Sequence, residues 1–222
     1  MCECNDHTYR STGISLRPNG NIMLRLPEDN VYNENKVQSI NFREEVKLPK
    51  GQDVNDWIAK HLSELINEVS MLFSLMTEFC TEKSCPKMTA GNGYKYLWSE
   101  EIENEKGEKK IVTYDLPAPS YINNLISWIK SCIDDTDLFP VSPNANYPPN
   151  FISIVKSMMK RLFRFYAHIY YHHLHHFEQL KVDAVLNTSF RHFIYLALEF
   201  QLVTPDQIEP LRDYIEFILN ND

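Results

Sequence analysis

The residues with the clearest potential for metal chemistry are cysteines and histidines that lie far apart in the chain. Cys80 and Cys85 are separated by four residues. Five histidines fall in one later stretch: His168, His172, His173, His175 and His176. Thiolate and imidazole are both good zinc ligands, and two of each would form a tetrahedral site. Because four protein ligands leave no open position, such a site would be structural.

The spacing alone does not choose the two histidines. His168 and His172 share one helix face at i, i+4, as do His172 and His176. A ligand pair of His168 and His173 would require the helix to end or bend between them. An alternative interpretation is a pair of inert cysteines beside a histidine-rich exposed turn, and it also stays open at this point.

A short basic cluster precedes the histidines. Lys160 and Arg164 lie one helical turn apart, with Arg161 beside them. Two guanidinium forks and one ammonium within a turn can clamp a phosphate by charge-assisted hydrogen bonds. A solvated helix face, or ion pairs with the surplus acids, would explain the same residues. From the residues alone, this second interpretation is favoured.

An acidic stripe follows the polar face of the first long predicted helix. Its members are Asp53, Asp56, Glu64 and Glu68, with Lys60 among them. Such a stripe beside apolar residues could receive a basic amphipathic segment. Ordinary i, i+4 pairing of Asp56, Lys60 and Glu64 is the favoured explanation when the stripe is judged alone.

Composition and motifs argue against several function classes. The chain has 22 basic and 30 acidic residues, so its formal net charge of −8 disfavours a general nucleic-acid or anionic-membrane binder. We expect no transmembrane segment, because no run of about 18 apolar residues occurs. The patterns GxSxG, GxxxxGK, GxGxxG and HExxH are absent. With no basic stretch leading into an apolar leader, we expect a reducing compartment.

Periodic apolar residues predict the helices that must position these groups. The stripes run over 54–79, 122–133, 152–169, a segment that starts at Asn187-Thr188, and a last segment that starts at Thr204. Residues 94–98 and 110–114 have strand composition around Lys106-Gly107, which predicts a hairpin. The predicted fold is mainly α, a helical bundle with a small β-hairpin insertion. We expect residues 1–47 to form a flexible N-terminal arm and residues 48–222 the helical domain.

Six unusual strings occur in order along the chain: Leu48-Pro49-x-Gly51, Asp56-Trp57, TEFCTEKSCPKM at 77–88, Leu138-Phe139-Pro140, KRLFRFYAHIY at 160–170 and LNTSFRHF at 186–193. Together they resemble the Mob family of kinase coactivators over roughly residues 48–220. The resemblance is closest to the branch that works with NDR/LATS-class kinases in Hippo and mitotic-exit signalling. It implies a core of antiparallel helices, no catalysis and one structural zinc. The implied zinc ligands are Cys80, Cys85, His168 and His173.

The resemblance also assigns the two charged surfaces. It implies a pocket for phosphothreonine peptides of an upstream Hippo-class kinase or a scaffold, formed by Lys160, Arg161 and Arg164. It further implies a surface for the basic N-terminal segment of the effector kinase, formed by Asp53, Asp56, Glu64 and His192. Two residues depart from the family pattern, since Gln52 stands where an acid is usual and Lys60 adds a positive charge. Either could lower affinity for a basic segment or select a different kinase.

The sequence therefore predicts a non-catalytic adaptor and allosteric coactivator of NDR/LATS-class serine/threonine kinases. One alternative keeps the fold but makes the protein a phosphopeptide-binding scaffold of a traffic or phosphatase complex, without direct kinase activation. Another, a zinc hydrolase, requires an open metal position. We expect a cytoplasmic location, with the nucleus, spindle poles and cell cortex as further sites, and no nucleic-acid partner.

Overall fold

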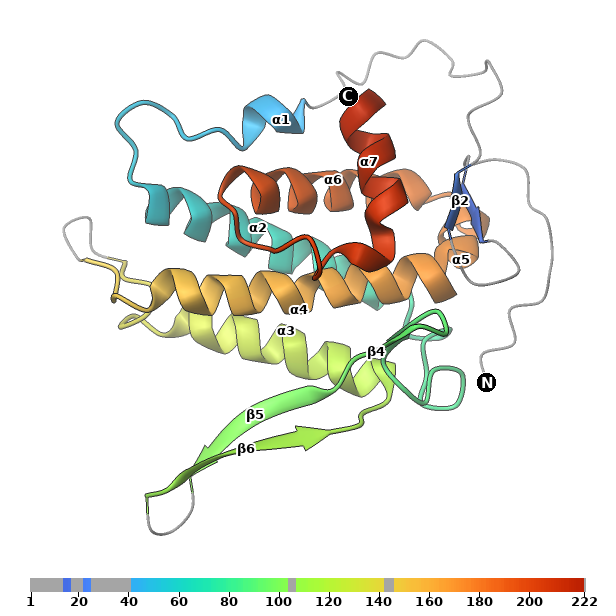
Figure 1. Ribbon diagram of the computed structural model, residues 1–222, viewed down its shortest axis with the longest axis horizontal. Helices are drawn as coiled ribbons and strands as arrows, with labels where there is room; N and C mark the ends of the chain where they lie inside the picture. The colour runs from blue at the N-terminus through green and yellow to red at the C-terminus, as the bar shows by residue number, and fades with distance from the viewer. Residues whose placement is uncertain (1–13, 17–21, 25–40, 104–106, 142–145, 222) are drawn as a thin grey trace.

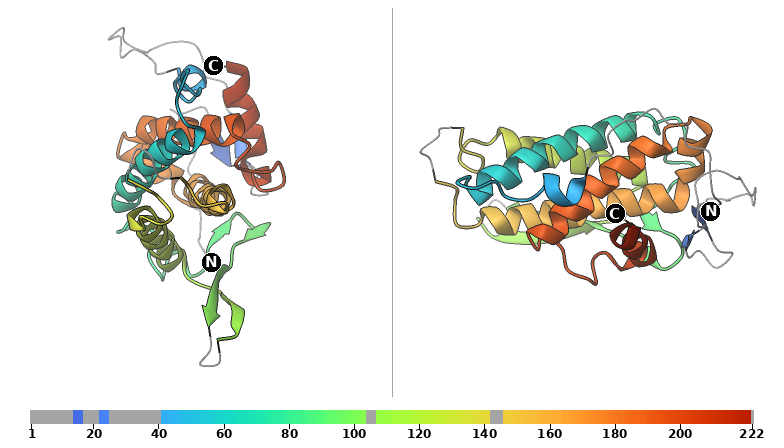
Figure 2. Two further views of the ribbon diagram at one scale, coloured as in Figure 1. Left: turned by 90° about the vertical axis from the view of Figure 1, so that its left-hand side faces the viewer. Right: turned by 90° about the horizontal axis from the view of Figure 1, so that it is seen from above.

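Four long helices form the body of the protein. The computed structural model describes residues 14–16, 22–24, 41–103, 107–141 and 146–221. The long helices are α2 (Val54–Ser74), α3 (Ala118–Asp134), α4 (Phe151–His172) and α6 (Asp183–Glu199). Helix α2 packs against α3 and α6, and α3 packs against α4, with neighbours running in opposite directions (Figures 1 and 2). The mainly α bundle predicted from the apolar stripes is confirmed.

Shorter elements complete the described structure. The helical ones are α1 (Phe42–Glu45), α5 (Leu174–Gln179), the 3-10 helix η1 (Glu209–Leu211) and α7 (Arg212–Asn221). The strands pair as antiparallel hairpins: β1 (Ile14–Leu16) with β2 (Ile22–Leu24), β3 (Thr89–Ala90) with β4 (Tyr94–Lys95), and β5 (Trp98–Glu103) with β6 (Lys109–Tyr114). The β5–β6 hairpin projects away from the helices (Figure 1).

The first strand of the predicted hairpin was placed too early. Lys109–Tyr114 forms β6, as the 110–114 pattern predicted, but its partner β5 begins at Trp98, which pairs with Tyr114. Tyr94 instead pairs with Ala90 in a separate short hairpin. Trp98 is buried and anchors the first residue of β5 in the body, and strand composition alone did not reveal this tertiary contact.

Helix α2 begins where the apolar stripe predicts, at Val54, but it ends earlier than predicted. Asp53 caps the helix, because its Oδ1 accepts hydrogen bonds from the backbone N–H groups of Asn55 at 2.8 Å and Asp56 at 3.2 Å. The helix stops at Ser74, although the apolar stripe continues to Phe79. Beyond Ser74 the backbone forms tighter i→i−3 turns, in which the Met76 N–H donates to the carbonyl of Phe73 at 2.9 Å and the Phe79 N–H to that of Met76 at 3.0 Å.

Two other predicted helix starts were wrong. Helix α6 begins at Asp183 rather than Asn187, whose side chain instead accepts a hydrogen bond from Tyr214 at 2.9 Å. The turn at Thr204 forms, with the Thr204 N–H donating to the Gln207 side chain at 3.2 Å. It does not propagate, because Pro210 has no N–H to donate, and α7 begins only at Arg212. Asn150 does precede α4, but its side chain makes no capping hydrogen bond.

One continuous core lies between the helices. Helix α4 has the largest number of buried residues among the described helices and is buried without a break from Phe165 to Tyr171. Its Tyr166 packs against Phe190 and Phe193 of α6. Most of residues 1–40 lie outside the described part, so the boundary at residue 47 and the flexibility of the arm stay predictions. Val46 is buried, and its carbonyl accepts a hydrogen bond from the Trp57 indole at 2.8 Å. Among the described residues, no helix combines the length and apolarity that crossing a membrane requires.

Candidate metal centre and two charged surfaces

A tight turn brings the two cysteines together just after α2. The Cys80 N–H donates to the carbonyl of Met76 at 2.7 Å, and the Cys85 N–H donates to the carbonyl of Thr81 at 2.8 Å. Between them, the Thr81 N–H donates to the Ser84 hydroxyl at 2.9 Å, and the Ser84 N–H donates to Thr81 Oγ1 at 3.1 Å. These paired bonds fold the intervening residues back, so that both sulfur atoms face α4.

The end of α4 supplies the two histidines. On a continuous helix, His168 and His173 would lie about 140° apart. Helix α4 ends at His172, however, and His173 adopts φ −131° at the C-cap. This change of direction turns its ring toward the same centre as His168. The buried residues Cys80, Cys85, His168 and His173 place their ligand atoms within 4.8 Å of one another.

The four atoms have the spacing of a tetrahedral zinc site. Zn–S bonds of about 2.3 Å and Zn–N bonds of about 2.0 Å at tetrahedral angles place sulfur and nitrogen about 3.5 Å apart. Cys80 Sγ lies 3.5 Å from His168 Nε2, and Cys85 Sγ lies 3.4 Å from His173 Nε2. The four residues can therefore hold a metal ion with little rearrangement, and as a complete set of protein ligands.

The surroundings prepare both imidazoles for metal binding. His168 Nδ1 donates to the carbonyl of Thr89 at 2.8 Å, which leaves the lone pair on Nε2 facing Cys80. Burial lowers the pKa of His168 to about 3 and that of His173 to about 2, so both rings are neutral near pH 7. The neighbouring His172 turns away and contacts the Thr89 hydroxyl at 3.0 Å. His176 stacks on Phe79.

The three basic residues of α4 do not have equal freedom. Lys160 is exposed. The Arg161 guanidinium lies against two nearly perpendicular tryptophan rings, 4.3 Å from the centroid of Trp98 and 4.6 Å from that of Trp128. It also donates to the carbonyl of Ser99 at 2.6 Å. Arg161 is therefore held in one orientation at the base of the β5–β6 hairpin.

Arg164 is held in a similar way one turn later. It donates to the Tyr121 hydroxyl at 2.8 Å, and its guanidinium lies 5.2 Å from the centroid of the Tyr96 ring. Both arginines are thus preoriented by aromatic side chains from β5, α3 and the segment before β5. These supporting aromatics were missed at the level of sequence, because nothing in the spacing of Trp98, Trp128 and Tyr121 connects them with α4.

The acidic stripe lies on the exposed side of α2. Asp53, Asp56 and Glu64 are all exposed. Asp56 accepts a hydrogen bond from the Tyr147 hydroxyl at 2.8 Å. Glu64 lies 3.7 Å from the Lys60 ammonium, which also sits 4.6 Å from the centroid of the Trp57 ring. The structure thus places three of the four predicted kinase-binding residues at the surface, with Lys60 among them.

The fourth, His192, lies beneath this surface. It is buried on α6, where its Nε2 is 2.8 Å from His61 Nδ1 and its Nδ1 donates to Glu68 at 3.0 Å. Glu68 also accepts a hydrogen bond from the Ser189 hydroxyl at 2.7 Å. Phe42 of α1 stacks on the His192 ring with centroids 5.6 Å apart. His192 therefore joins α1, α2 and α6 instead of presenting its ring to solvent.

The buried His61 makes stability depend on pH. Burial, together with His192 and Lys60, lowers its pKa to about 4, against the opposing effect of Glu68. The unfolded chain binds a proton at His61 near pH 6.5, while the folded protein does not. The free energy of unfolding should therefore fall as the pH drops from about 6.5 to about 4, by up to about 3 kcal/mol from this residue.

This prediction is tested by urea unfolding of wild type and His61→Asn at several pH values. The variant should lose part of the acid-induced destabilisation, while the contribution of the metal-centre histidines remains in both proteins. Identical pH dependence of the two proteins would contradict the assignment.

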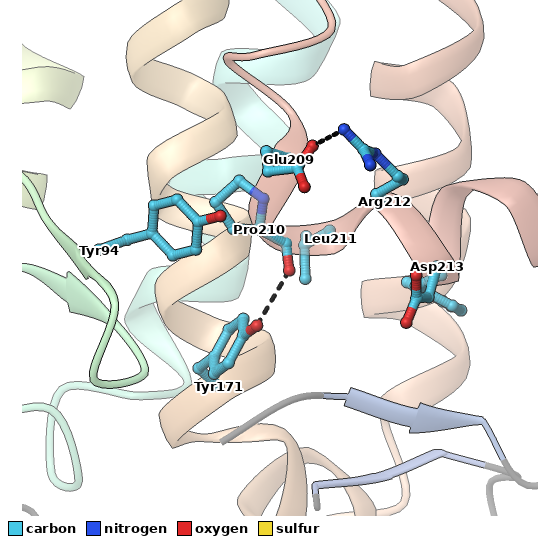
Figure 3. A pocket seen from close by; sticks show the side chains of 8 residues that line it. Tyr94, Tyr171, Glu209, Pro210, Leu211, Arg212 and Asp213 are labelled. Carbon is cyan, nitrogen blue, oxygen red and sulfur yellow. Dashed lines mark hydrogen bonds and ion pairs between the residues drawn. The ribbon is translucent and has the colours of Figure 1, made fainter. Parts of the chain in front are cut away.

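A separate hollow lies between β4, the end of α4 and the last helical segment. It has a volume of about 160 Å³ and is lined by Tyr94, Tyr171 and residues 209–214 (Figure 3). The Tyr171 hydroxyl donates to the carbonyl of Pro210 at 3.0 Å, and Glu209 forms an ion pair with Arg212. None of the predicted site residues lines this hollow.

Comparison with known proteins identifies the family of the chain. Residues 34–211 match the sequence model of the Mob1/phocein family. The chain belongs to the Mob1/phocein family. Among similar Mob proteins is MOB kinase activator-like 1B of Arabidopsis thaliana, with 42% identity over 179 residues, which covers 81% of this chain and 80% of the relative.

Two further similar Mob proteins come from a slime mould and a fission yeast. MOB kinase activator-like 1 homolog A of Dictyostelium discoideum is 40% identical over 190 residues, which covers 86% of each chain. The Maintenance of ploidy protein mob1 of Schizosaccharomyces pombe is 38% identical over 185 residues, which covers 83% of this chain and 85% of the relative. The family resemblance predicted from the six strings is thereby confirmed.

Proposed function

We propose that this Mob protein is a non-catalytic adaptor that activates a serine/threonine kinase of the NDR/LATS class. In this proposal, the exposed carboxylates of α2 bind the basic N-terminal segment of the kinase. Binding would order that segment and so bias the kinase toward its active state. Zn2+ would occupy the Cys80, Cys85, His168 and His173 centre and hold the end of α2 against the end of α4.

The observation that carries the proposal is the row of exposed carboxylates on α2. Asp56 and Glu64 lie two helical turns apart on one face, and Asp53 caps the same helix. A basic amphipathic helix could place cations at the same repeat and gain both affinity and a faster association rate. The relatives' names, MOB kinase activator-like 1A and 1B, support a kinase as the partner. The metal centre has a full set of four protein ligands, which supports a structural role over a hydrolytic one.

Charge reversal tests the kinase-binding surface. We expect Asp56→Lys/Glu64→Lys to weaken binding of an NDR/LATS-class N-terminal peptide by about 100-fold or more, because two attractive contacts become like-charge contacts. Isothermal titration measures the effect. Glu199→Lys/Glu216→Lys, a matched reversal of exposed acids on α6 and α7, should bind as wild type does. The proposal would be wrong if both double variants bound the peptide equally.

The basic cluster supports a second partner. Lys160, Arg161 and Arg164 would receive the phosphate of a phosphothreonine peptide from an upstream Hippo-class kinase or a scaffold. A phosphate of about −2 charge would meet three cations, two of which are preoriented and so lose little conformational entropy on binding. The buried cation–aromatic contacts of Arg161 serve stability as well, so this part of the proposal needs a direct binding test.

We expect phosphate-dependent binding that disappears in Lys160→Ala/Arg164→Ala. The measurement compares a phosphothreonine peptide with its unphosphorylated twin by isothermal titration, and circular dichroism verifies folding. Lys156→Ala removes an exposed lysine one turn before Lys160 and should leave the affinity unchanged. Equal affinity for the two peptides would leave the acidic surface as the only support for an adaptor role.

One observation favours the alternative of a scaffold that does not activate a kinase. Lys60 lies in the acidic stripe, 3.7 Å from Glu64, and reduces the negative charge offered to a basic segment. Lys60→Ala should strengthen kinase-peptide binding if the stripe is the binding surface. A protein that binds the phosphopeptide, but no kinase segment even as Lys60→Ala, would fit a traffic or phosphatase complex.

A further inference from the structure

Two histidines and a glutamate converge between α2 and α6, away from the cysteines. His61 and Glu64 lie on successive turns of α2, and His192 faces them from α6. Their ligand atoms lie within 4.8 Å of one another. His61 Nδ1 is 2.8 Å from His192 Nε2 and 3.5 Å from Glu64 Oε2. His61 comes near the start of α2 and Cys80 follows its end, so this group is roughly 20 Å from the four-ligand centre at 1.5 Å per residue.

The hydrogen bonds around this group direct one nitrogen lone pair, that of His192 Nε2, toward its centre. His192 Nδ1 donates to Glu68 at 3.0 Å, which leaves Nε2 of His192 free to accept. Histidine ligands of metals often donate their second nitrogen to a carboxylate in this way, which fixes the ring and raises its basicity. His61 now carries its proton on Nδ1, which points at His192. This proton can move to Nε2 of the same His61 ring, a buried nitrogen that has no hydrogen-bond partner in the described structure. A metal ion can therefore enter without release of a proton.

The distances suit a small divalent transition-metal ion. Zinc bonds of about 2.0 Å at tetrahedral angles place neighbouring nitrogen and oxygen ligands about 3.3 Å apart. The 3.5 Å between His61 and Glu64 is already close to this value. The two ring nitrogens must separate by about half an ångström, which a small rotation of either ring provides. Lys60 is the competing cation, but its contact with Glu64 is exposed, and such pairs contribute little.

We propose that His61, Glu64 and His192 form a second metal site that binds Zn2+ or a similar transition-metal ion, with Glu68 orienting His192. Two imidazoles and one carboxylate leave at least one coordination position open. The half-exposed Glu64 carboxylate places that position at the surface, whereas both histidines are buried. Unlike the cysteine-containing centre, this site could thus complete its coordination with water or with a side chain of a bound partner. Metal binding at these residues does not require kinase binding.

Zinc titration tests the second site on the full-length protein. We expect protein that carries one tightly held zinc per chain to bind a second equivalent of Zn2+ in isothermal titration. Glu64→Gln should weaken this second event more than about tenfold, because it removes a ligand, and Glu68→Gln should weaken it about 10–100-fold through loss of the orienting carboxylate. Glu199→Gln, which removes an exposed acid at the end of α6, should bind as wild type does.

Cobalt identifies which residues hold the second ion. Co2+ added to zinc-loaded protein should give visible d–d absorption without a thiolate-to-cobalt charge-transfer band, because the proposed site contains no sulfur. Two cysteines near the N-terminus of the sequence, Cys2 and Cys4, are the rival ligands. An ion bound by their thiolates would show that band and would be unaffected by Glu64→Gln. A stoichiometry of one, or a second ion bound equally well by Glu64→Gln, would overturn the proposal and leave the group as a hydrogen-bonded network.

Discussion

Cys85→Ser is expected to release the metal and to cause a large loss of stability. A serine hydroxyl is a poor replacement for a thiolate, and structural zinc contributes about 10–16 kcal/mol of apparent binding free energy in zinc-finger peptides. The body of this protein has its own core, so we expect only part of that value to appear as lost stability. A loss of about 5 kcal/mol would lower the melting temperature by about 10–20 °C.

The physical reason is the position of the centre rather than the strength of one bond. Cys80 and Cys85 follow α2, and His168 and His173 lie at the end of α4, so the ion would cross-link the segment after α2 to the end of α4. Without the metal ion, two buried thiols and two buried imidazoles have no shared binding partner. Zinc content per chain, measured by mass spectrometry of the metal, and thermal unfolding with and without a chelator would follow both effects.

Cys132→Ser provides the matched control. Cys132 is a half-buried free thiol on α3 that does not belong to the four-ligand group. Its substitution should leave zinc content unchanged and alter stability by about 1 kcal/mol or less. If Cys85→Ser retained a full equivalent of zinc and had the same melting temperature as wild type, the proposed ligand set would be wrong.

The sequence predicted the bundle well because the helices carry their own signal. Each long helix buries an apolar stripe whose 3.6-residue repeat is visible without tertiary information, and Asp53 marks the start of α2 through a bond to its own backbone. Ends and starts were harder to predict. The apolar stripe of α2 continues past Ser74, but the backbone there changes to i→i−3 turns. Asn187 accepts a hydrogen bond from Tyr214 instead of capping a helix. Asparagine suits several local roles, and the fold selects one.

The metal centre shows where spacing stops being informative. Cysteine and histidine types predicted a four-ligand site, but five histidines offered several pairs. The family resemblance named His168 and His173, and the structure supplies the reason: α4 ends between His172 and His173. His192 illustrates the opposite case, since its place in the family pattern suggested a contact residue. It is buried against His61 and Glu68, a contact between residues more than 120 positions apart.

Arg161→Ala should weaken both stability and phosphopeptide binding. Its guanidinium lies against the rings of both Trp98 and Trp128 and donates to the carbonyl of Ser99. Each cation–aromatic contact is worth about 0.5–2 kcal/mol, and the charged hydrogen bond about 1.5–3 kcal/mol. Because Arg161 is only half-buried, we expect a loss at the low end of their sum, about 2.5–4 kcal/mol. At this chain length, that loss lowers the melting temperature by about 5–15 °C.

Two further variants separate the structural role of Arg161 from its proposed phosphate contact. Arg161→Lys keeps the charge but loses the planar guanidinium that contacts the two tryptophan rings, so it should recover only part of the stability. Lys160→Ala, at an exposed neighbour, should weaken phosphopeptide binding without changing the melting temperature. If Arg161→Ala had the same melting temperature as wild type, the contacts of the guanidinium with the two tryptophans would contribute nothing to stability. If Lys160→Ala and Arg161→Lys both bound the phosphopeptide with undiminished affinity, phosphate recognition would have to lie elsewhere on the protein.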